Sequence, residues 1–316
     1  MIITLLLVSI IGFFLINLPP GSYLDVRISE LRAMGNSSAE RQIEGLKERY
    51  RLNDPIYVQY FRWITGFVRG DFGDSFMFRR EVSELIGDRI LFTVLIATGT
   101  LLFTWIMAIP IGIYSAVNQY TAGDTIFTFI GFIGLSIPSF LLALILMVIS
   151  AVVFGNPIGG LLSEEFVGAS WSLAKLIDLL KHLWIPVVVI GTAGTAGLIR
   201  MMRGNLLDIL NQQYVKTARA KGLTERKVIY KHAVRNAIHP LIMTLGMSLP
   251  SIISGSTVVA IVLNLPTMGP LYFRALRAQD MFLAGTFLMF MSFMLILGNL
   301  LADILLVWVD PRISLE

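Results

Sequence analysis

The residues best suited to do chemistry in this sequence gather in one basic segment, Arg200–Pro240. It holds nine lysines and arginines against only Asp208 and Glu225, which gives it a net charge of +7. Such a surface attracts anionic partners, either a groove on another protein or the phosphates of anionic lipids. If the chain spans a membrane, this charge also predicts that the segment is cytoplasmic, because basic loops stay on that side.

Residues for bond-making or metal chemistry are scarce. The chain has no cysteine, and its three histidines (His182, His232 and His239) are scattered, so disulfides, thiolate metal sites and cysteine nucleophiles are excluded. It has no G-x-x-x-x-G-K-[ST] phosphate loop and no H-E-x-x-H, and the string nearest to G-x-S-x-G, Gly134–Pro138, ends in proline. We therefore expect no catalytic residue, no metal site and no ATP bound in a phosphate loop.

The basic segment contains a predicted helical elbow. Gln213–Leu223 reads QYVKTARAKGL, which predicts a helix with small side chains as far as Lys221. Gly222 can adopt the left-handed conformation that ends a helix, and Thr224 can cap the next one. A basic helix–turn–helix with an alanine-lined elbow suits a groove on a partner protein. The alternative is a topology signal that rests on anionic lipid.

The composition indicates that lipid is the solvent for the elements that carry this elbow. Of 316 residues, 55% are hydrophobic and 15% charged, against about 25% charged in soluble domains, and the mean hydropathy is +0.75. A spanning helix needs about 20 mostly apolar residues. Six segments meet or approach that length: Ile2–Leu18, Leu91–Val117, Thr125–Phe154, Leu183–Ile199, Leu241–Leu263 and Phe282–Val309. The third contains Pro138, so we expect it to be tilted, kinked or partly outside the bilayer.

With the basic loop inside, six spans put both termini in the cytoplasm and residues 19–90 outside. The predicted organisation is a first membrane helix over residues 1–18, an extracytoplasmic segment over 19–90, and a core of five membrane helices over 91–316 with a cytoplasmic loop at 200–240. The 19–90 segment looks folded, because apolar residues recur at helical spacing. These residues are Ile43, Leu46 and Tyr50, and then Val58, Phe61, Ile64 and Val68.

Polar side chains inside the spans are candidates to line a pathway, because polar atoms are costly against lipid. The fifth span carries Ser248, Ser251, Ser254, Ser256 and Thr257. The alternative role for these small residues is helix packing. Asn299 and Asp303 lie one turn apart on the sixth span, and a structural hydrogen bond is favoured for them over substrate contact.

Several motifs in register resemble one family. Y-V-K-T-A-R-A-K-G-L, with K-H-A-V-R-N-A after it, is similar to the cytoplasmic signature of ABC importer permeases, specifically the first permease of the oligopeptide/dipeptide/nickel class. Against the general pattern E-A-A-x3-G-x9-I-x-L-P, Gly222 is in place. Lys216, Thr217 and Arg235 replace Glu, Ala and Pro. Further similar elements are Tyr50–Pro55 (G-L-D-x-P), Arg69–Ser75 (R-G-D-L-G-x-S) and Asp310–Ile313 (D-P-R-I).

The resemblance implies an all-α membrane permease of a prokaryotic inner or plasma membrane. It would pair with a sister permease, two cytoplasmic ATP-binding subunits that hold ATP and Mg²⁺, and an extracytoplasmic substrate-binding protein, and it would bind no nucleic acid. This chain would supply the pathway and the lever of an alternating-access mechanism, without bond chemistry. The residues implied in coupling to the ATPases are Thr217, Ala218, Arg219, Ala220, Lys221, Gly222 and Leu223.

The resemblance favours a peptide substrate, with an oligosaccharide second and nickel third. The family pattern V-E-x-x-F-x-x-P-G-x-G has Ala260 and Thr267 here in place of Glu and Gly, and the P-T-x-G-P form resembles a branch associated with oligosaccharides as well as peptides. A stand-alone secondary transporter would show inverted repeats, and the sequence has none. A membrane-embedded enzyme is disfavoured by the missing motifs.

Overall fold

The computed structural model describes residues 2–17, 23–34, 40–45, 54–155 and 159–310. This part of the chain is helices and loops, apart from one isolated bridge between Asp74 and Glu81, which agrees with the all-α prediction. Tyr50–Asn53 and Pro311–Ile313, which belong to two of the motifs above, lie outside the described residues. The chain divides into two compact units, unit 1 (residues 1–91 and 267–293) and unit 2 (residues 92–266 and 294–316).

Unit 1 is built on an aromatic core. Its elements are α1 (Ile2–Asn17), α2 (Tyr23–Met34), α4 (Ile56–Val68), α14 (Met268–Arg277) and the first turns of α5 (Val82–Val117) and α15 (Met281–Val309). Phe13, Tyr60 and Trp63 bury their rings together with Phe76 and two methionines. The hydroxyls of Ser9 and Tyr60 lie 2.8 Å apart, which links α1 to α4.

The apolar spacing over Val58–Val68 falls on helix α4, and the residues of that spacing are not the ones the helix buries most deeply. Phe61 and Val68 are exposed, whereas Tyr60 and Trp63 are buried. Both faces carry apolar residues, and the ring of Trp63 packs on Phe13, so the larger aromatic surface decides which face is buried. Ile43 is buried with Ile28 and Leu31, while Leu46 and Tyr50 lie outside the described residues.

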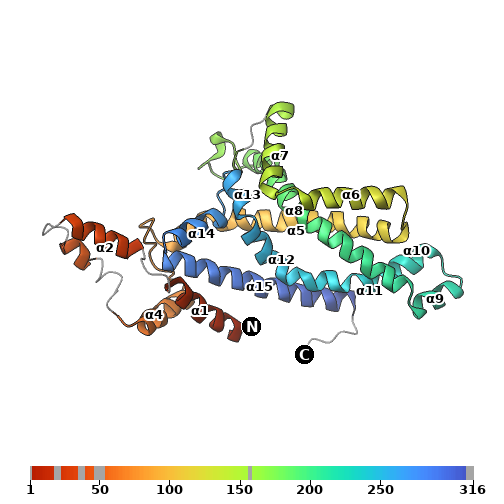
Figure 1. The fold of residues 1–316 in the computed structure, drawn as a ribbon, viewed down its shortest axis with the longest axis horizontal. Helices are drawn as coiled ribbons and strands as arrows, with labels where there is room; N and C mark the ends of the chain where they lie inside the picture. The colour runs from red at the N-terminus through yellow and green to blue at the C-terminus, as the bar shows by residue number, and fades with distance from the viewer. Residues whose placement is uncertain (1, 18–22, 35–39, 46–53, 156–158, 311–316) are drawn as a thin grey trace. The chain divides into compact units, whose positions relative to one another are not determined.

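Unit 2 is organised around the long helix α8. Its further elements are α6 (Ala122–Ser136), α7 (Ser139–Phe154), a 3₁₀ turn (Glu164–Phe166), α8 (Leu173–Leu210), α9 (Gln213–Ala220), α10 (Glu225–Lys227), the π-helix η2 (Val228–Ala233), α11 (Val234–Ala237), α12 (His239–Gly255) and α13 (Thr257–Val262). α6 and α7 pack on α8. α9 and α10 follow α8, at the far right of Figure 1.

Three of the six predicted spans correspond to helices long and apolar enough to cross a membrane: Val82–Val117, His239–Val262 and Met281–Val309. A bent pair of helices raises the number to as many as four among the described residues. The predicted span Ile2–Leu18 is the short helix α1. Leu183–Ile199 lies within α8, where Lys181 and Arg200 flank an apolar stretch shorter than about 20 residues.

The single helix expected over Thr125–Phe154 is corrected to two. α6 ends at Ser136 and α7 begins at Ser139, and their axes differ by 103°. The cause is Pro138, which lacks an N–H and disfavours a helical conformation in the residue before it. Ile137 accordingly has an extended backbone, with φ −83° and ψ 121°. The proline was correctly expected to disturb this segment, but the size of the bend was not predicted.

Candidate functional site

The elbow predicted from the basic segment is present between α9 and α10. α9 ends at Ala220, and Gly222 has φ +74°, as expected for a residue that reverses the chain in the left-handed region. The Gly222 amide donates to the Arg219 carbonyl at 2.9 Å, and the Leu223 amide to the Ala218 carbonyl at 3.4 Å. Thr224 is the N-cap of α10, but its side chain makes no capping hydrogen bond. We refer to Thr217–Leu223 as the elbow.

The inner face of the elbow is an apolar core. Val215 and Ala218 are buried, and they pack with buried residues of η2 and α8. Ala218 and Ala233 are small, which lets the short helices approach closely. Ala218 is only 6% exposed, so it supports the elbow from inside.

The outer face of the elbow is polar and basic. Thr217, Arg219, Ala220, Lys221 and Gly222 are exposed, and Leu223 is half-buried. Arg219 reaches across the turn to Glu225 in an exposed ion pair, with Nη2 2.6 Å from Oε1. The hydrogen bond from Arg219 lowers the pKa of Glu225. The sequence did not predict this pair, because a six-residue separation matches no helical spacing.

Hydrogen bonds connect the basic segment to the surrounding helices of unit 2. The Arg235 Nε donates to the Val309 carbonyl at 2.7 Å, in the last turn of α15, where a helix leaves its carbonyls unpaired. The Asn236 side chain donates to the Tyr214 hydroxyl at 2.8 Å. These two bonds connect α11 to the last turn of α15 and to α9.

The predicted pathway residues lie on α12 and at its junction with α13. Ser251 and Ser254 are exposed, whereas Ser248, Ser256 and Thr257 are half-buried. Ser248 and Ser256 donate to their own helix, to the Thr244 and Ile253 carbonyls at 2.8 and 2.9 Å, so their hydroxyls already have acceptors. Of the five predicted pathway residues, only Ser251 and Ser254 are therefore exposed.

The two exposed serines share a face of α12 with two methionines. Met243 and Met247 are 65% and 72% exposed, and with Ser251 they follow a four-residue spacing that aligns them on one side of the helix. The opposite side packs on α15, where Gly246 lies close to Gly298 and Asn299. We call Met243, Met247, Ser251 and Ser254 the open face of α12.

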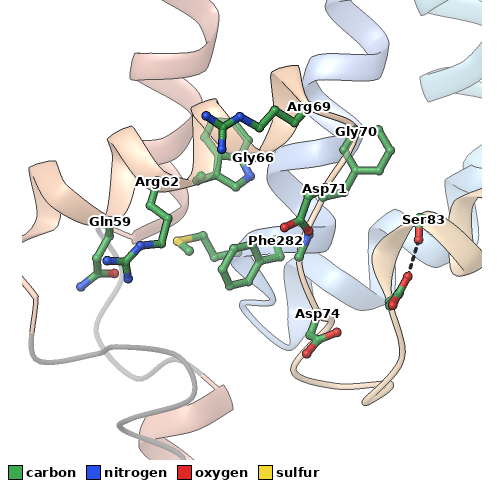
Figure 2. A pocket seen from close by; sticks show the side chains of 14 residues that line it. Gln59, Arg62, Gly66, Arg69, Gly70, Asp71, Asp74, Ser83 and Phe282 are labelled. Atoms are coloured by element: carbon green, nitrogen blue, oxygen red, sulfur yellow. Dashed lines mark hydrogen bonds between the residues drawn. The ribbon is translucent and has the colours of Figure 1, made fainter.

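Unit 1 contains a pocket that the sequence did not predict. Its volume is about 660 Å³ and it lies among α4, the loop after it, and the starts of α5 and α15. Figure 2 shows Gln59 and Arg62 on α4 at one side, with Asp71 and Asp74 on the loop at the other. Gly73 brings this loop close to α15, because an added Cβ would lie 2.6 Å from the Phe282 ring.

A buried carboxylate anchors the loop beside this pocket. The Ser75 hydroxyl donates to Asp280 Oδ2 at 2.5 Å, the Met77 amide donates to the same oxygen at 3.1 Å, and the Leu283 amide donates to Oδ1 at 3.3 Å. Burial raises the pKa of the Asp280 carboxyl, and these hydrogen bonds oppose the rise. Ser75, the last residue of the Arg69–Ser75 motif, thus donates a structural hydrogen bond to Asp280, which lies 205 residues away along the chain.

The described residues offer no cluster of three or more His, Asp or Glu side chains that could hold a metal ion. The functional features of the structure are therefore surfaces, the elbow and the open face of α12, together with the pocket of unit 1.

Comparisons with known proteins bear on these surfaces. Residues 108–315 match a family described as "binding-protein-dependent transport system inner membrane component". The chain is 38% identical to the oligopeptide transport system permease protein AppB of Bacillus subtilis, an alignment that covers 98% of this chain and 95% of the relative.

Alignments with other relatives cover a similar share of both chains. The oligopeptide permease OppB of Haemophilus influenzae is 31% identical (98% and 95% coverage), and the glutathione permease GsiC of Salmonella paratyphi A is 30% identical (98% and 94%). A chain of the inward-facing MetNI methionine ABC transporter superposes with a TM-score of 0.52 at 17% identity, covering 72% of this chain and 96% of that one. This last likeness concerns the fold alone.

Proposed function

Because this chain belongs to the family of binding-protein-dependent transport system inner membrane components and is a permease subunit of an ABC importer, we propose that it forms half of a translocation pathway for oligopeptides or dipeptides. It is a transport subunit and not an enzyme. The observation that carries the peptide proposal is the 38% identity, over 98% of the chain, to an oligopeptide permease.

An oligosaccharide or nickel substrate is the less favoured alternative. The P-T-x-G form that suggested oligosaccharides begins at Pro266, and its Thr267 and Gly269 are buried at the start of α14. Since buried residues of a helix start do not touch a passing solute, this departure from the family pattern carries little weight for the substrate.

The proposed assembly contains a sister permease, two ATP-binding subunits and an extracytoplasmic substrate-binding protein. ATP and Mg²⁺ are held by the ATP-binding subunits, and this chain holds neither. The family description, with its reference to a binding protein, supports this arrangement. The exposed basic outer face of the elbow is the surface that fits a cytoplasmic partner, because it lies on a preformed apolar core and needs no refolding to bind.

The proposed topology is six spans in a prokaryotic inner membrane, with the elbow and both termini in the cytoplasm and residues 19–90 outside. The net charge of +7 on residues 200–240 supports this orientation. Because the chain lacks cysteine, single cysteines can report it. An impermeant thiol reagent should label Glu44→Cys, but not Ala220→Cys, in intact cells; the reverse pattern would invert the topology.

The proposed mechanism is alternating access driven from the elbow. When the ATP-binding subunits close, the elbow moves with them. Its packing on α8, together with the Arg235–Val309 hydrogen bond elsewhere in the basic segment, carries the motion into the membrane helices. The open face of α12 is the proposed pathway wall. Its serines and methionines combine hydroxyls with flexible apolar side chains, a surface that adapts to varied peptide side chains.

Uptake into proteoliposomes tests the proposed function. The complete transporter, reconstituted with the binding protein encoded beside it, should accumulate radiolabelled trialanine when ATP and Mg²⁺ are supplied at the ATPase side. A labelled oligosaccharide and Ni²⁺ should not accumulate. ATP-dependent uptake of the oligosaccharide or Ni²⁺ without peptide uptake would overturn the substrate, and uptake without any ATP-binding subunit would indicate a secondary transporter.

A further inference from the structure

A second pocket lies in unit 2, between α6 with its preceding loop and the C-terminal half of α8. Its volume is about 620 Å³, which is within the usual range for sites that hold a small molecule. One end, formed by residues 120–128 and 200–204, is polar and charged. The other end, formed by residues 129–135 and 196–199, is apolar. A molecule that fits both ends has a polar head and an apolar tail.

The acidic residue in the wall of this pocket already has a partner. Asp124 is 4% exposed and accepts two hydrogen bonds from Arg203, from Nε at 3.1 Å and from Nη2 at 2.9 Å. The Tyr120 amide donates to the same carboxylate at 3.0 Å. A two-pronged pair of this kind fixes both side chains in place. The Asp124 charge is therefore neutralised within the protein and leaves no demand for a bound cation.

Arg200 gives the polar end a positive charge that the protein does not neutralise. It lines the pocket and is exposed, and no ion pair within the described ranges involves it. With Arg203 paired to Asp124, the charged side chains that line the pocket sum to +1. Because a guanidinium presents parallel N–H donors that match the oxygens of a phosphate, the head that fits this end is a phosphate.

The apolar end is a surface that water covers poorly. Phe129, Phe132 and Leu135 line it and are 63%, 50% and 40% exposed. At its floor the two helices come close, because a Cβ added to Gly131 would lie 3.7 Å from the Ala196 Cβ. α6 belongs to a bent pair of helices that together are long and apolar enough to cross a membrane. An acyl chain is therefore the cover that suits this end.

We propose that this pocket binds one anionic phospholipid, with its phosphate at Arg200 and an acyl chain along the apolar end. The match in charge and polarity supports a lipid, since a free phosphate ion would leave the apolar end uncovered. Arg200 follows directly after the predicted span Leu183–Ile199, so its guanidinium can reach the level of the lipid phosphates. The inference goes beyond the proposed function, because this lipid is bound and not transported. The proposed topology would place it in the inner leaflet.

Photocrosslinking in the complete transporter locates the lipid. The transporter is reconstituted in phosphatidylcholine nanodiscs that contain a trace of phosphatidylglycerol with a diazirine in its acyl chain, and mass spectrometry of the digested protein then maps the adducts. We expect adducts on residues 129–135 of the wild type, and fewer when the diazirine is carried by phosphatidylcholine. Free glycerol phosphate should not compete, because it has no acyl chain. Nanodiscs expose both leaflets, so the result does not depend on the proposed orientation.

Two pairs of variants test the two ends of the pocket. Arg200→Gln should lower the phosphatidylglycerol adducts about fivefold, the contribution expected of one basic residue at an anionic lipid. Arg226→Gln is its matched control, because Arg226 is exposed in the same basic segment but does not line the pocket. Leu135→Trp should narrow the apolar end and lower the adducts. Ile133→Trp, at a similarly exposed position outside the pocket wall, should label like the wild type.

The inference is overturned by equal labelling with the two lipids, or by equal labelling of the wild type and Arg200→Gln. An equal loss in Arg200→Gln and Arg226→Gln would also overturn it, because the whole basic segment would then attract anionic lipid without a site. A complete transporter with no lipid adduct on residues 129–135 would assign this surface to the sister permease instead. Peptide uptake by the wild type, measured in parallel, keeps the proposed function separate: if uptake occurs while labelling fails, only the inference fails.

Discussion

The elbow and the open face of α12 differ in what supports them. The elbow carries its charges on an apolar core in which Val215 and Ala218 are buried, so its shape depends on a few small side chains. The open face of α12 consists of exposed side chains on a regular helix, with Ser251 and Ser254 outside any core. Substitutions in the elbow should therefore change the conformation of the elbow, whereas substitutions on the open face should change only the passage of substrate along it.

The largest expected effect is that of Ala218→Glu. A carboxylate forced into the elbow core should cost more than about 3 kcal/mol, and the elbow should lose its fold together with its ATP-binding partners. Ala220→Glu, two residues away and exposed, keeps the fold and perturbs only the contact surface. We expect ATPase subunits to be absent from purified Ala218→Glu complexes and reduced in Ala220→Glu complexes. Equal retention in both would contradict the inward placement of Ala218.

Gly222→Val should have the next largest effect. The left-handed φ of Gly222 would strain valine by about 1–2 kcal/mol, while an added Cβ meets nothing within 4 Å. The subunit should therefore accumulate normally, but hydrolysis should proceed with little transport. Gly222→Asn is the matched control, since asparagine tolerates this conformation, and it should retain most of the uptake per ATP hydrolysed. If valine and asparagine behave alike, backbone conformation is not the reason for glycine here.

Ser254→Trp tests the open face of α12. The indole would fill space beside the helix without entering a core, so we expect normal assembly and ATP-binding subunit content but strongly reduced uptake. Ser254→Ala should transport normally, because the Ser254 hydroxyl makes only a long 3.5 Å contact with the Ser251 carbonyl. Normal uptake by the tryptophan variant would assign Ser254 to packing or lipid contact.

The smallest expected effect is the loss of the exposed Arg219–Glu225 pair. Arg219→Ala should change the free energy of unfolding by less than about 1 kcal/mol. Since the pair lowers the pKa of Glu225 below its ordinary value of 4.5, its contribution is present above that value and is lost as the pH falls through the lowered pKa. Thermal unfolding of the wild type and Arg219→Ala should converge in acid. A difference that grows toward low pH would contradict this assignment.

Local features of the fold were predictable where a residue type forces them. Gly222 ends a helix in the conformation that glycine favours, and Pro138 interrupts a helix because it lacks an N–H. The buried face of α4 was not predictable, because Phe61 and Tyr60 offer similar apolar surface to a spacing argument. Only the packing of Trp63 on Phe13, from a different helix, decides between them.

The pocket of unit 1 lay beyond sequence reasoning for a different reason. Its wall combines residues near position 70 with Met281 and Phe282, and the carboxylate that anchors it, Asp280, bonds to Ser75. No periodicity links positions so far apart. The Arg69–Ser75 motif was a visible signal, but its role as a loop tied to a buried carboxylate needs the tertiary structure.

Site-specific crosslinking from the elbow tests the central claim most directly. The chain has no cysteine, so Ala220→Cys carries a single thiol on the exposed outer face, and Ser254→Cys carries one on the open face of α12. Each is modified with a benzophenone maleimide in membranes that contain the complete transporter and is then photoactivated. We expect the probe at position 220 to form an adduct with an ATP-binding subunit and the probe at position 254 to form none with it. An intact complex in which position 220 crosslinks only to lipid would contradict the coupling role of the elbow and leave the basic segment as a topology signal.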